Sequence, residues 1–314
     1  MKMGWPVLMV THRPEEIPAL TTHVMLVDEH RVVAQGSKRD VLRYAATHFG
    51  TATRNAPASS RSTAVRKKAN SSAPLVELRR VTVTANRTRI LSKVNWTICR
   101  GQNWAVFGPN GAGKTTLLNL IQGDHPQAHA LDIHWFGKSA DSPAALWQAR
   151  RRIGSMSPEL HAHYPPEWPV LDVVCSGYFN SIGLYEPCSK GQQSAAREWL
   201  QDFGLAVHKR LPFGELSMGQ QRLVLLARAM VKRPSLLLFD EPLQSLDGIH
   251  RHSLLAAVDR VVEQTGATLV FATHLRNELP RCITHVLQLK AGRTVFRGKR
   301  RRVSPSPFVS FRVS

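Results

Sequence analysis

The feature that most constrains this chain is a nine-residue stretch, GPNGAGKTT, at residues 108–116. It fits the pattern G-x-x-x-x-G-K-[ST] of a phosphate-binding loop. A short apolar run at 102–107 precedes it and a helix-like run at 117–121 follows it. A glycine-rich turn without a phosphate is the alternative. The agreement of strand, loop, Lys-Thr pair and helix favours a phosphate site at the positive end of a helix.

The residue types in this loop suit phosphate chemistry. Its glycines are expected to adopt backbone angles that other residues resist, so that backbone N–H groups surround phosphate oxygens. Lys114 can reach the β- and γ-phosphates, and the Thr115 hydroxyl can hold Mg²⁺. The predicted nucleotide-binding residues are Gly108, Pro109, Asn110, Gly111, Ala112, Gly113, Lys114, Thr115 and Thr116.

A second group of motifs lies about 100 residues further on. Ser217 is a plausible N-cap of an amphipathic helix, and 236–239 is an apolar run typical of a buried parallel strand. Asp240 and Glu241 follow at the end of this strand, where ligands bind in open α/β sheets. Asp240 can hold Mg²⁺, and Glu241 can orient or deprotonate an attacking water. A helix cap is the alternative reading of this acidic pair.

A further strand is predicted at 267–272, and it ends at His274. A histidine at that end of the sheet, level with Glu241, can hydrogen-bond a γ-phosphate. Elsewhere the pattern predicts short strands, a loop and helices. These are strands at 75–84, 90–91 and 94–98, a loop at 157–164, and helices at 171–178, 192–203 and 251–264.

The net charge of +20 is unevenly distributed. Residues 51–73 carry five cations and no acid, and residues 281–314 carry nine cations and no acid. We interpret these segments as a solvated basic linker and tail, with at most a weak, salt-sensitive attraction to nucleic acid or anionic lipid.

No run approaches the roughly 18 apolar residues of a membrane helix, and the apolar start is short for a signal peptide. The chain is therefore predicted to be cytoplasmic, with any contact to the inner face of the membrane made through a partner. The four cysteines form no C-x-x-C pair and are expected to be reduced.

The chain contains an internal repeat. A shift of 262 residues without a gap places His12 on His274, residues 22–24 on 284–286, and Gly36 on Gly298. The predicted organisation is the C-terminal remnant of a first copy at 1–50, a flexible linker at 51–73, a complete second copy at 74–303 and a tail at 304–314. In the first copy, strands are predicted at 7–10, 24–27 and 31–36, and a helix at 38–44. Under the same shift, the phosphate loop of the first copy would lie before Met1.

Together these motifs resemble the ATP-binding cassette (ABC) ATPases. Residues 108–116 match Walker A, 216–220 the signature sequence, 236–241 Walker B, 245–247 the D-loop and His274 the switch histidine. The resemblance implies an α/β P-loop NTPase fold with a mostly parallel core sheet, an antiparallel β subdomain and a helical subdomain. It also implies ATP hydrolysis with Mg²⁺. The implied catalytic residues are Lys114, Glu241 and His274, the metal residues Thr115 and Asp240, and the signature contacts to nucleotide Ser217, Gly219 and Gln220.

Three segments, 123–127, 176–183 and 240–247, look more specifically like the molybdenum-transport and photorepair (ModF) type, whose members carry two cassettes in one chain. In this family ATP is sandwiched between the phosphate loop of one cassette and the signature sequence of another. The implied partners are ATP, a second cassette (from another copy or from the rest of the first) and a membrane permease subunit. The sequence does not name the transported solute.

The chain departs from the family pattern at three places. Ala85 stands where most cassettes place an aromatic that stacks on adenine, which predicts a weak preference for ATP over GTP. Ser157-Pro158-Glu159 replaces the Q-loop glutamine, and Met218 replaces a glycine of the signature sequence.

Two alternative functions stay open at this point. One is a non-transport ABC protein that acts on nucleic acid or ribosomes, which the basic linker and tail favour weakly. The other is a nucleotide-binding fragment that is inactive without its first cassette.

Overall fold

In the computed structural model of the chain, the residues with a described placement are 8–9, 17–18, 20–28, 31–49, 74–139, 143–275 and 278–300. They divide into two compact units. The larger comprises Lys68–Gln244 and Leu254–Ser314, and the smaller comprises Met1–Lys67 and Ser245–Ser253. The predicted linker at 51–73, the tail at 304–314, His12 and both ends of the predicted strand at 7–10 lie outside the described residues.

The core of the larger unit is a six-stranded sheet with the strand order β12-β11-β5-β10-β9-β8. The strands β11, β5, β10, β9 and β8 run parallel to one another. Only β12 is antiparallel, to its neighbour β11. Every residue of β5, β9 and β10 is buried, which explains their uninterrupted apolar sequences. The strands are β5 Trp104–Phe107, β8 Ile153–Met156, β9 Leu236–Asp240, β10 Thr268–Thr273, β11 His285–Lys290 and β12 Arg293–Lys299.

A second, antiparallel sheet has the order β4-β3-β6-β7. It consists of β3 Pro74–Ala85, β4 Thr88–Cys99, β6 Ile133–Trp135 and β7 Lys138–Ser139. The prediction of two short strands at 90–91 and 94–98 is wrong, because β4 runs through both. Ser92 and Lys93 interrupt the apolar pattern, yet the strand continues because register shifts accommodate them and Lys93 adopts a positive φ of 51°.

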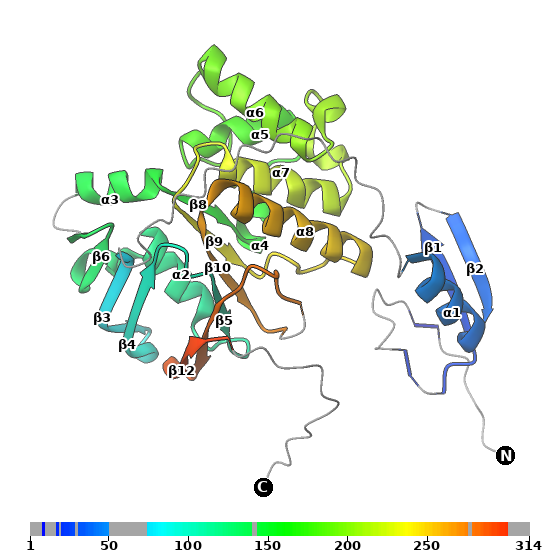
Figure 1. The fold of residues 1–314 in the computed structure, drawn as a ribbon, viewed down its shortest axis with the longest axis horizontal. Coiled ribbons are helices and arrows are strands. Elements are labelled where there is room, and N and C mark those ends of the chain that lie inside the picture. Colours follow the sequence, from blue (N-terminus) through cyan, green and yellow to red (C-terminus); the bar gives the residue numbers. More distant parts are fainter. Residues whose placement is uncertain are drawn as a thin grey trace, which may run out of the picture. The chain divides into compact units, whose positions relative to one another are not determined.

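Helices accompany the core sheet and form a separate helical region (Figure 1). The helices that follow residue 74 in the described chain are α2 Lys114–Gln122, α3 Pro143–Arg151, α4 Pro158–Ala162, α5 Val170–Cys175, α6 Lys190–Asp202, α7 Met218–Met230 and α8 Gly248–Thr265. Short 3₁₀ turns lie at Pro126–Ala130, Ser176–Tyr178, Ala206–His208 and Phe213–Glu215. The predicted helices at 171–178, 192–203 and 251–264 are confirmed within a few residues.

The prediction of a loop at 157–164 is wrong in part, because α4 occupies its first half. The Ser157 side chain accepts a hydrogen bond from the Leu160 backbone N–H at 3.0 Å, and Pro158 occupies the first turn. Proline lacks an N–H that the first helical turn would leave unpaired anyway, so the Ser-Pro pair starts a helix here.

The smaller unit contains a hairpin of β1 (His23–Asp28) and β2 (Arg31–Ser37), followed by α1 (Lys38–Phe49). Shifted by the 262 residues of the repeat, the bounds of β1 and β2 coincide with those of β11 and β12. The register is the same as well, and both hairpins have an irregularity at the equivalent place, Leu26/Val27 in one and Gln288/Leu289 in the other. The sequence repeat is therefore also a structural repeat.

Candidate functional site

The glycine-rich loop connects β5 to α2, as the sequence predicts. Gly111 and Gly113 have φ values of 78° and 96°, in the left-handed region. The expectation of such an angle at Gly108 is wrong, because Gly108 does not have a positive φ. A Cβ at Gly108 would lie 2.7 Å from the backbone oxygen of Leu289, so this glycine is required by the close approach of β11 instead.

Lys114 lies at the start of α2 and is only 6% exposed. Its Nζ donates to the backbone oxygens of Gly108 and Pro109 at 2.9 and 3.3 Å. The same Nζ lies 3.2 Å from Glu241 Oε1. The lysine is thus held folded back over the loop, where its ammonium group can meet phosphate oxygens.

Glu241 lies directly after β9 and connects Lys114 to His274. Its second carboxylate oxygen, Oε2, lies 2.9 Å from His274 Nδ1, and its backbone N–H donates to Ala272 O at 2.9 Å. Glu241 adopts a positive φ of 41°, a rare conformation for a residue with a side chain. Such backbone conformations recur at functional sites, where the surrounding structure enforces them.

Thr115 and Asp240 form the second contact between the loop and β9. The Thr115 hydroxyl donates to Asp240 Oδ2 at 2.6 Å. Burial raises the pKa of Asp240, although the hydrogen bond from Thr115 acts in the opposite direction. The other oxygen, Oδ1, is buried and has no hydrogen-bond partner among the described residues. A hydroxyl and an unsatisfied carboxylate oxygen side by side fit a Mg²⁺ ion, which prefers hard oxygen ligands.

The signature sequence forms the start of α7. The Ser217 side chain accepts from the Gln220 N–H at 3.3 Å, and the Gln220 side chain accepts from the Ser217 N–H at 3.0 Å. This reciprocal pair is a capping box, so the prediction of Ser217 as an N-cap is confirmed. Gly219 is buried and Met218 is 44% exposed. Among the described residues, no hydrogen bond or ion pair joins Ser217, Gly219 or Gln220 to the phosphate loop.

The segment that replaces the Q-loop glutamine lies close to this site. Glu159 is exposed on α4, near enough to Asp240 that its charge contributes to the raised pKa of Asp240. His161 Nε2 lies 2.5 Å from Gln221 Oε1 on α7. Burial lowers the pKa of His161. The sequence did not predict this contact between α4 and α7, because a single histidine outside any motif gives no indication of its partner.

Sequence reasoning also missed the role of the β11–β12 turn. The Gly292 N–H donates to Ala112 O in the loop at 3.3 Å, and Gly292 O accepts from the Ser92 N–H at 2.8 Å. A Cβ at Gly292 would lie 2.2 Å from Ile90 O, which explains the glycine. The β11–β12 turn therefore contacts the phosphate loop from the β11 side of β5, whereas Glu241 follows β9, on the other side of β5. The same turn connects the loop to β4.

Comparisons with known proteins are consistent with this geometry. A profile described as "ABC transporter" matches residues 91–244. The chain is 41% identical over 218 residues to the ABC transporter ATP-binding protein ModF of Escherichia coli, covering 68% of this chain and 44% of that protein. It is 32% identical over 222 residues to the uncharacterized ABC transporter ATP-binding protein YlmA of Bacillus subtilis, covering 69% of this chain and 83% of the relative.

A third relative, an uncharacterized ABC transporter ATP-binding protein of Schizosaccharomyces pombe, is 29% identical over 293 residues, covering 92% of this chain and 58% of the relative. The chain thus spans about half the length of the ModF and S. pombe relatives.

Solved structures show the same fold. A bacterial ABC transporter cassette solved as a dimer has a TM-score of 0.62 at 26% identity, covering 73% of this chain and 100% of that one. A cassette dimer bound to ADP and Pi, in a post-hydrolysis state, has a TM-score of 0.61 at 27% identity with the same coverage. Within the described residues, we find no helix whose length and apolar character would suit a membrane span.

Proposed function

The chain belongs to the family of ABC transporter ATP-binding proteins, and from this premise we propose that it binds ATP with Mg²⁺ and hydrolyses it. The observation that carries the proposal is the contact series from Lys114 through Glu241 to His274 at the mouth of the phosphate loop. These contacts support the proposal because they hold a cation, a carboxylate and an imidazole together, the groups that a γ-phosphate and its attacking water would need.

Lys114 serves to neutralise the β- and γ-phosphates, and the backbone N–H groups of residues 110–116 hold their oxygens. Glu241 orients a water molecule and accepts its proton as the water oxygen attacks the γ-phosphorus, while the bond from that phosphorus to the β–γ bridging oxygen breaks and ADP leaves with that oxygen. His274 donates to the oxygens on which negative charge develops. The contact between His274 and Glu241 keeps both groups on the same side of the loop.

Thr115 and Asp240 would hold Mg²⁺, directly or through its water molecules. When bound, the ion neutralises charge on the β- and γ-phosphates. The support for this assignment is the 2.6 Å contact between the two side chains and the buried Asp240 Oδ1 that lacks a partner in the described chain.

The second half of the site comes from another cassette. Ser217, Gly219 and Gln220 contact the phosphates of a nucleotide bound to the partner cassette, and Met218 lies beside them. The exposed start of α7 supports this role, as does the dimeric assembly of the solved bacterial cassette. Residues 1–50 correspond to the C-terminal part of a first cassette, residues 74–303 are a complete one, and 51–73 link the two. The shared bounds and register of the two hairpins support this organisation.

The cycle of hydrolysis would drive a transport system through a permease subunit. Two relatives carry names for import of a solute, phosphonates for PhnC of Pseudomonas putida and spermidine or putrescine for PotA of Fusobacterium nucleatum, at 32% and 29% identity. The molybdenum-transport assignment rests on the ModF resemblance alone, at 41% identity over 218 residues.

The test of the proposed function is ATP turnover by the full chain and by Glu241→Gln. Since a general base contributes about 10²–10⁴-fold to a rate, turnover should fall by at least about 100-fold while ATP binding is retained. Glu263→Gln is the matched control, because Glu263 is exposed on α8 and precedes the start of β10, whereas the site residue His274 follows the end of that strand. Undiminished turnover in Glu241→Gln would contradict the assignment of Glu241, and binding without any turnover in the wild-type chain would contradict the hydrolysis proposal.

A further inference from the structure

The surface between β4 and the β11–β12 hairpin is hollow and strongly basic. One hollow has a volume of about 590 Å³, and an adjoining one of about 500 Å³ shares Arg89, Ser92 and Arg293 with it. We call the second hollow the basic groove, and define it by its four cations, Arg89 and Lys93 of β4 and Arg293 and Arg297 of β12. The remaining lining residues are the neutral Ser92, Asn95 and Thr294, so no acid lines the groove.

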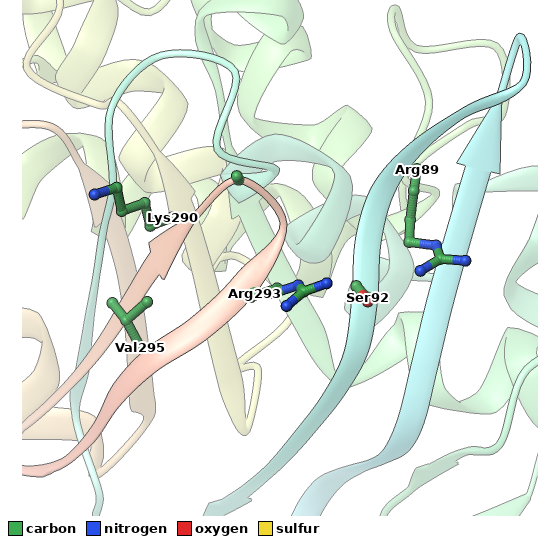
Figure 2. Close-up of a pocket in the computed structure, with 6 residues that line it drawn as sticks. Arg89, Ser92, Lys290, Arg293 and Val295 are labelled. Carbon is green, nitrogen blue, oxygen red and sulfur yellow. The ribbon is translucent and has the colours of Figure 1, made fainter.

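The walls of the groove are held in place by the backbone. Arg297 Nη1 donates to Asn95 O at 2.7 Å, and the Ser92 N–H donates to Gly292 O at 2.8 Å. Figure 2 shows Arg293 extending from the hairpin toward Ser92, with Arg89 beyond it on β4. The side chains of Arg89, Lys93 and Arg293 have no ion pair or hydrogen bond to another described residue. Their charges are therefore available to a ligand.

The internal repeat shows that the three cations by which the hairpin lines the two hollows are not all needed to form the hairpin. Under the 262-residue shift, Lys290, Arg293 and Arg297 coincide with Asp28, Arg31 and Gln35 of the first hairpin. The backbone bounds and register are the same in both copies, whereas the summed charge of the three positions is +3 in one and zero in the other. The formation of the hairpin therefore does not require all three of these cations.

The geometry points to the basic groove as a binding site for the phosphodiester backbone of a nucleic acid, engaged without base recognition. Arg293 and Arg297 are four residues apart on one strand, which at about 3.3 Å per residue separates them by up to about 13 Å. This spread fits a linear polyanion better than a single phosphate. No aromatic side chain lines the groove, so it offers charge but no stacking platform for bases.

The four cations are exposed on the two sides of the hollow, which also favours a strand of nucleic acid over an anionic membrane. A flexible strand can follow the hollow and meet cations of both β4 and β12, whereas a flat bilayer would meet only the outermost of them. This inference revises the prediction of a solvated basic tail at 281–314. Part of that charge, including Arg293 and Arg297, belongs to a folded hairpin and faces cations from β4.

The test is binding of a labelled oligothymidylate of about 20 nucleotides to the full chain, measured by fluorescence anisotropy between about 50 and 200 mM salt. The groove variant combines Arg89→Gln, Lys93→Gln and Arg293→Gln. The matched control removes three exposed cations outside the groove, by Lys138→Gln, Lys190→Gln and Arg210→Gln. Thermal melting and ATP binding of each variant show whether it is folded.

The groove variant should bind at least about tenfold more weakly at low salt, and the slope of log K against log salt should fall by about 2, since each neutralised phosphate contributes about 0.7. The control should keep the wild-type affinity and slope. Equal weakening in both variants would overturn the proposal in favour of long-range attraction to the net charge.

Two competitors and one vesicle-binding assay separate other ligands. Displacement of the oligonucleotide by ATP would show that the groove is an extension of the nucleotide site and would overturn the proposal, as would equal competition by polyglutamate, an acidic peptide. Groove-dependent binding to phosphatidylserine vesicles without oligonucleotide binding would assign the surface to a membrane instead. The expected result is that neither competitor displaces the oligonucleotide, that the vesicles show no groove-dependent binding, and that the groove variant alone loses oligonucleotide affinity.

Discussion

At the scale of single residues, the site depends on a few side chains whose partners lie more than a hundred residues away. Thr115 and Asp240 are 125 positions apart in sequence, and a single hydrogen bond joins them. Asp240 keeps one buried oxygen without a partner in the described chain, which is costly unless a ligand satisfies it. The Thr115 hydroxyl and the unpaired oxygen of Asp240 are therefore suited to bind a cation.

Replacement of Thr115 by valine tests this assignment. Valine has a similar shape but removes the hydroxyl, so the binding of ATP should lose most of its dependence on Mg²⁺. ATP affinity in excess EDTA should be nearly the same for the wild type and Thr115→Val. The measurement is ATP titration by fluorescence with and without Mg²⁺. Thr265→Val, whose hydroxyl donates to Val261 O at the end of α8, is the control. A full Mg²⁺ effect in Thr115→Val would exclude the hydroxyl as a ligand.

At the scale of elements, the start of α7 combines a structural and a proposed functional role. Ser217 and Gln220 form a capping box, and Ser189 and Gln192 form the same motif at the start of α6. The two caps are alike in geometry, with 3.3 and 3.2 Å bonds from the third helical N–H to the serine oxygen. Only α7 carries the proposed signature sequence.

The pair of serines therefore separates stability from function. Ser217→Ala and Ser189→Ala should each destabilise the fold by about 1 kcal/mol, the typical cost of a lost N-cap. Only Ser217→Ala should also reduce ATP turnover, because only Ser217 contacts a nucleotide in the proposed pair of cassettes. Urea unfolding and turnover of both variants are the measurements. A parallel loss of turnover in both would assign the effect to stability alone.

A second feature of this scale lies just after α7, at the partly buried Lys232. Its Nζ donates to Arg150 O at 3.1 Å and to Asn180 Oδ1. Burial, together with the nearby charges of Arg228 and Arg150, lowers the pKa of Lys232 to about 7. Above pH 7 the folded chain therefore releases this proton, whereas the unfolded chain keeps it up to the ordinary lysine pKa.

Because the unfolded state binds the additional proton, stability should rise with pH from about 7 to 8.5 through this group. Lys232→Met should remove that rise while preserving the aliphatic packing. Lys190→Met, at an exposed position of α6, is the control and should keep the wild-type pH dependence. Urea midpoints across this pH range give the comparison, and an unchanged pH dependence in Lys232→Met would show that Lys232 is charged in the folded chain.

At the scale of the whole molecule, the proposed chemistry requires two cassettes, because one phosphate loop meets the signature sequence of a partner. Turnover should then rise faster than linearly with protein concentration. In a two-fold pair the same surfaces meet twice, so defects in different parts can complement each other.

Mixing two inactive variants tests this arrangement. Lys114→Ala removes the phosphate contact and Ser217→Glu blocks the signature contact, so each alone should be inactive. An equal mixture should recover about a quarter of the wild-type turnover, since half of the chains form mixed pairs with one intact site of two. Separate assays of each variant at the same total concentration are the control. Absence of recovery, with dimers demonstrated by sedimentation, would exclude shared sites.

The sequence by itself determined the motifs and the strands next to them. The phosphate loop, the apolar run of β9 and the capping box of α7 are local patterns, so their residue types predict their structure directly. The 262-residue shift likewise predicts β1 and β2, which the structure places in the register of β11 and β12.

Tertiary structure alone decided which distant groups meet. The continuity of β4 across Ser92 and Lys93 depends on pairing with β3 along its whole length, which no local pattern contains. Gly108 is required by β11, the pKa of Lys232 is set by its neighbours, and the basic groove forms where β4 lies beside the hairpin. The physical reason is the same in each case: burial and charge depend on atoms brought close by the fold, and sequence separation carries no record of that proximity.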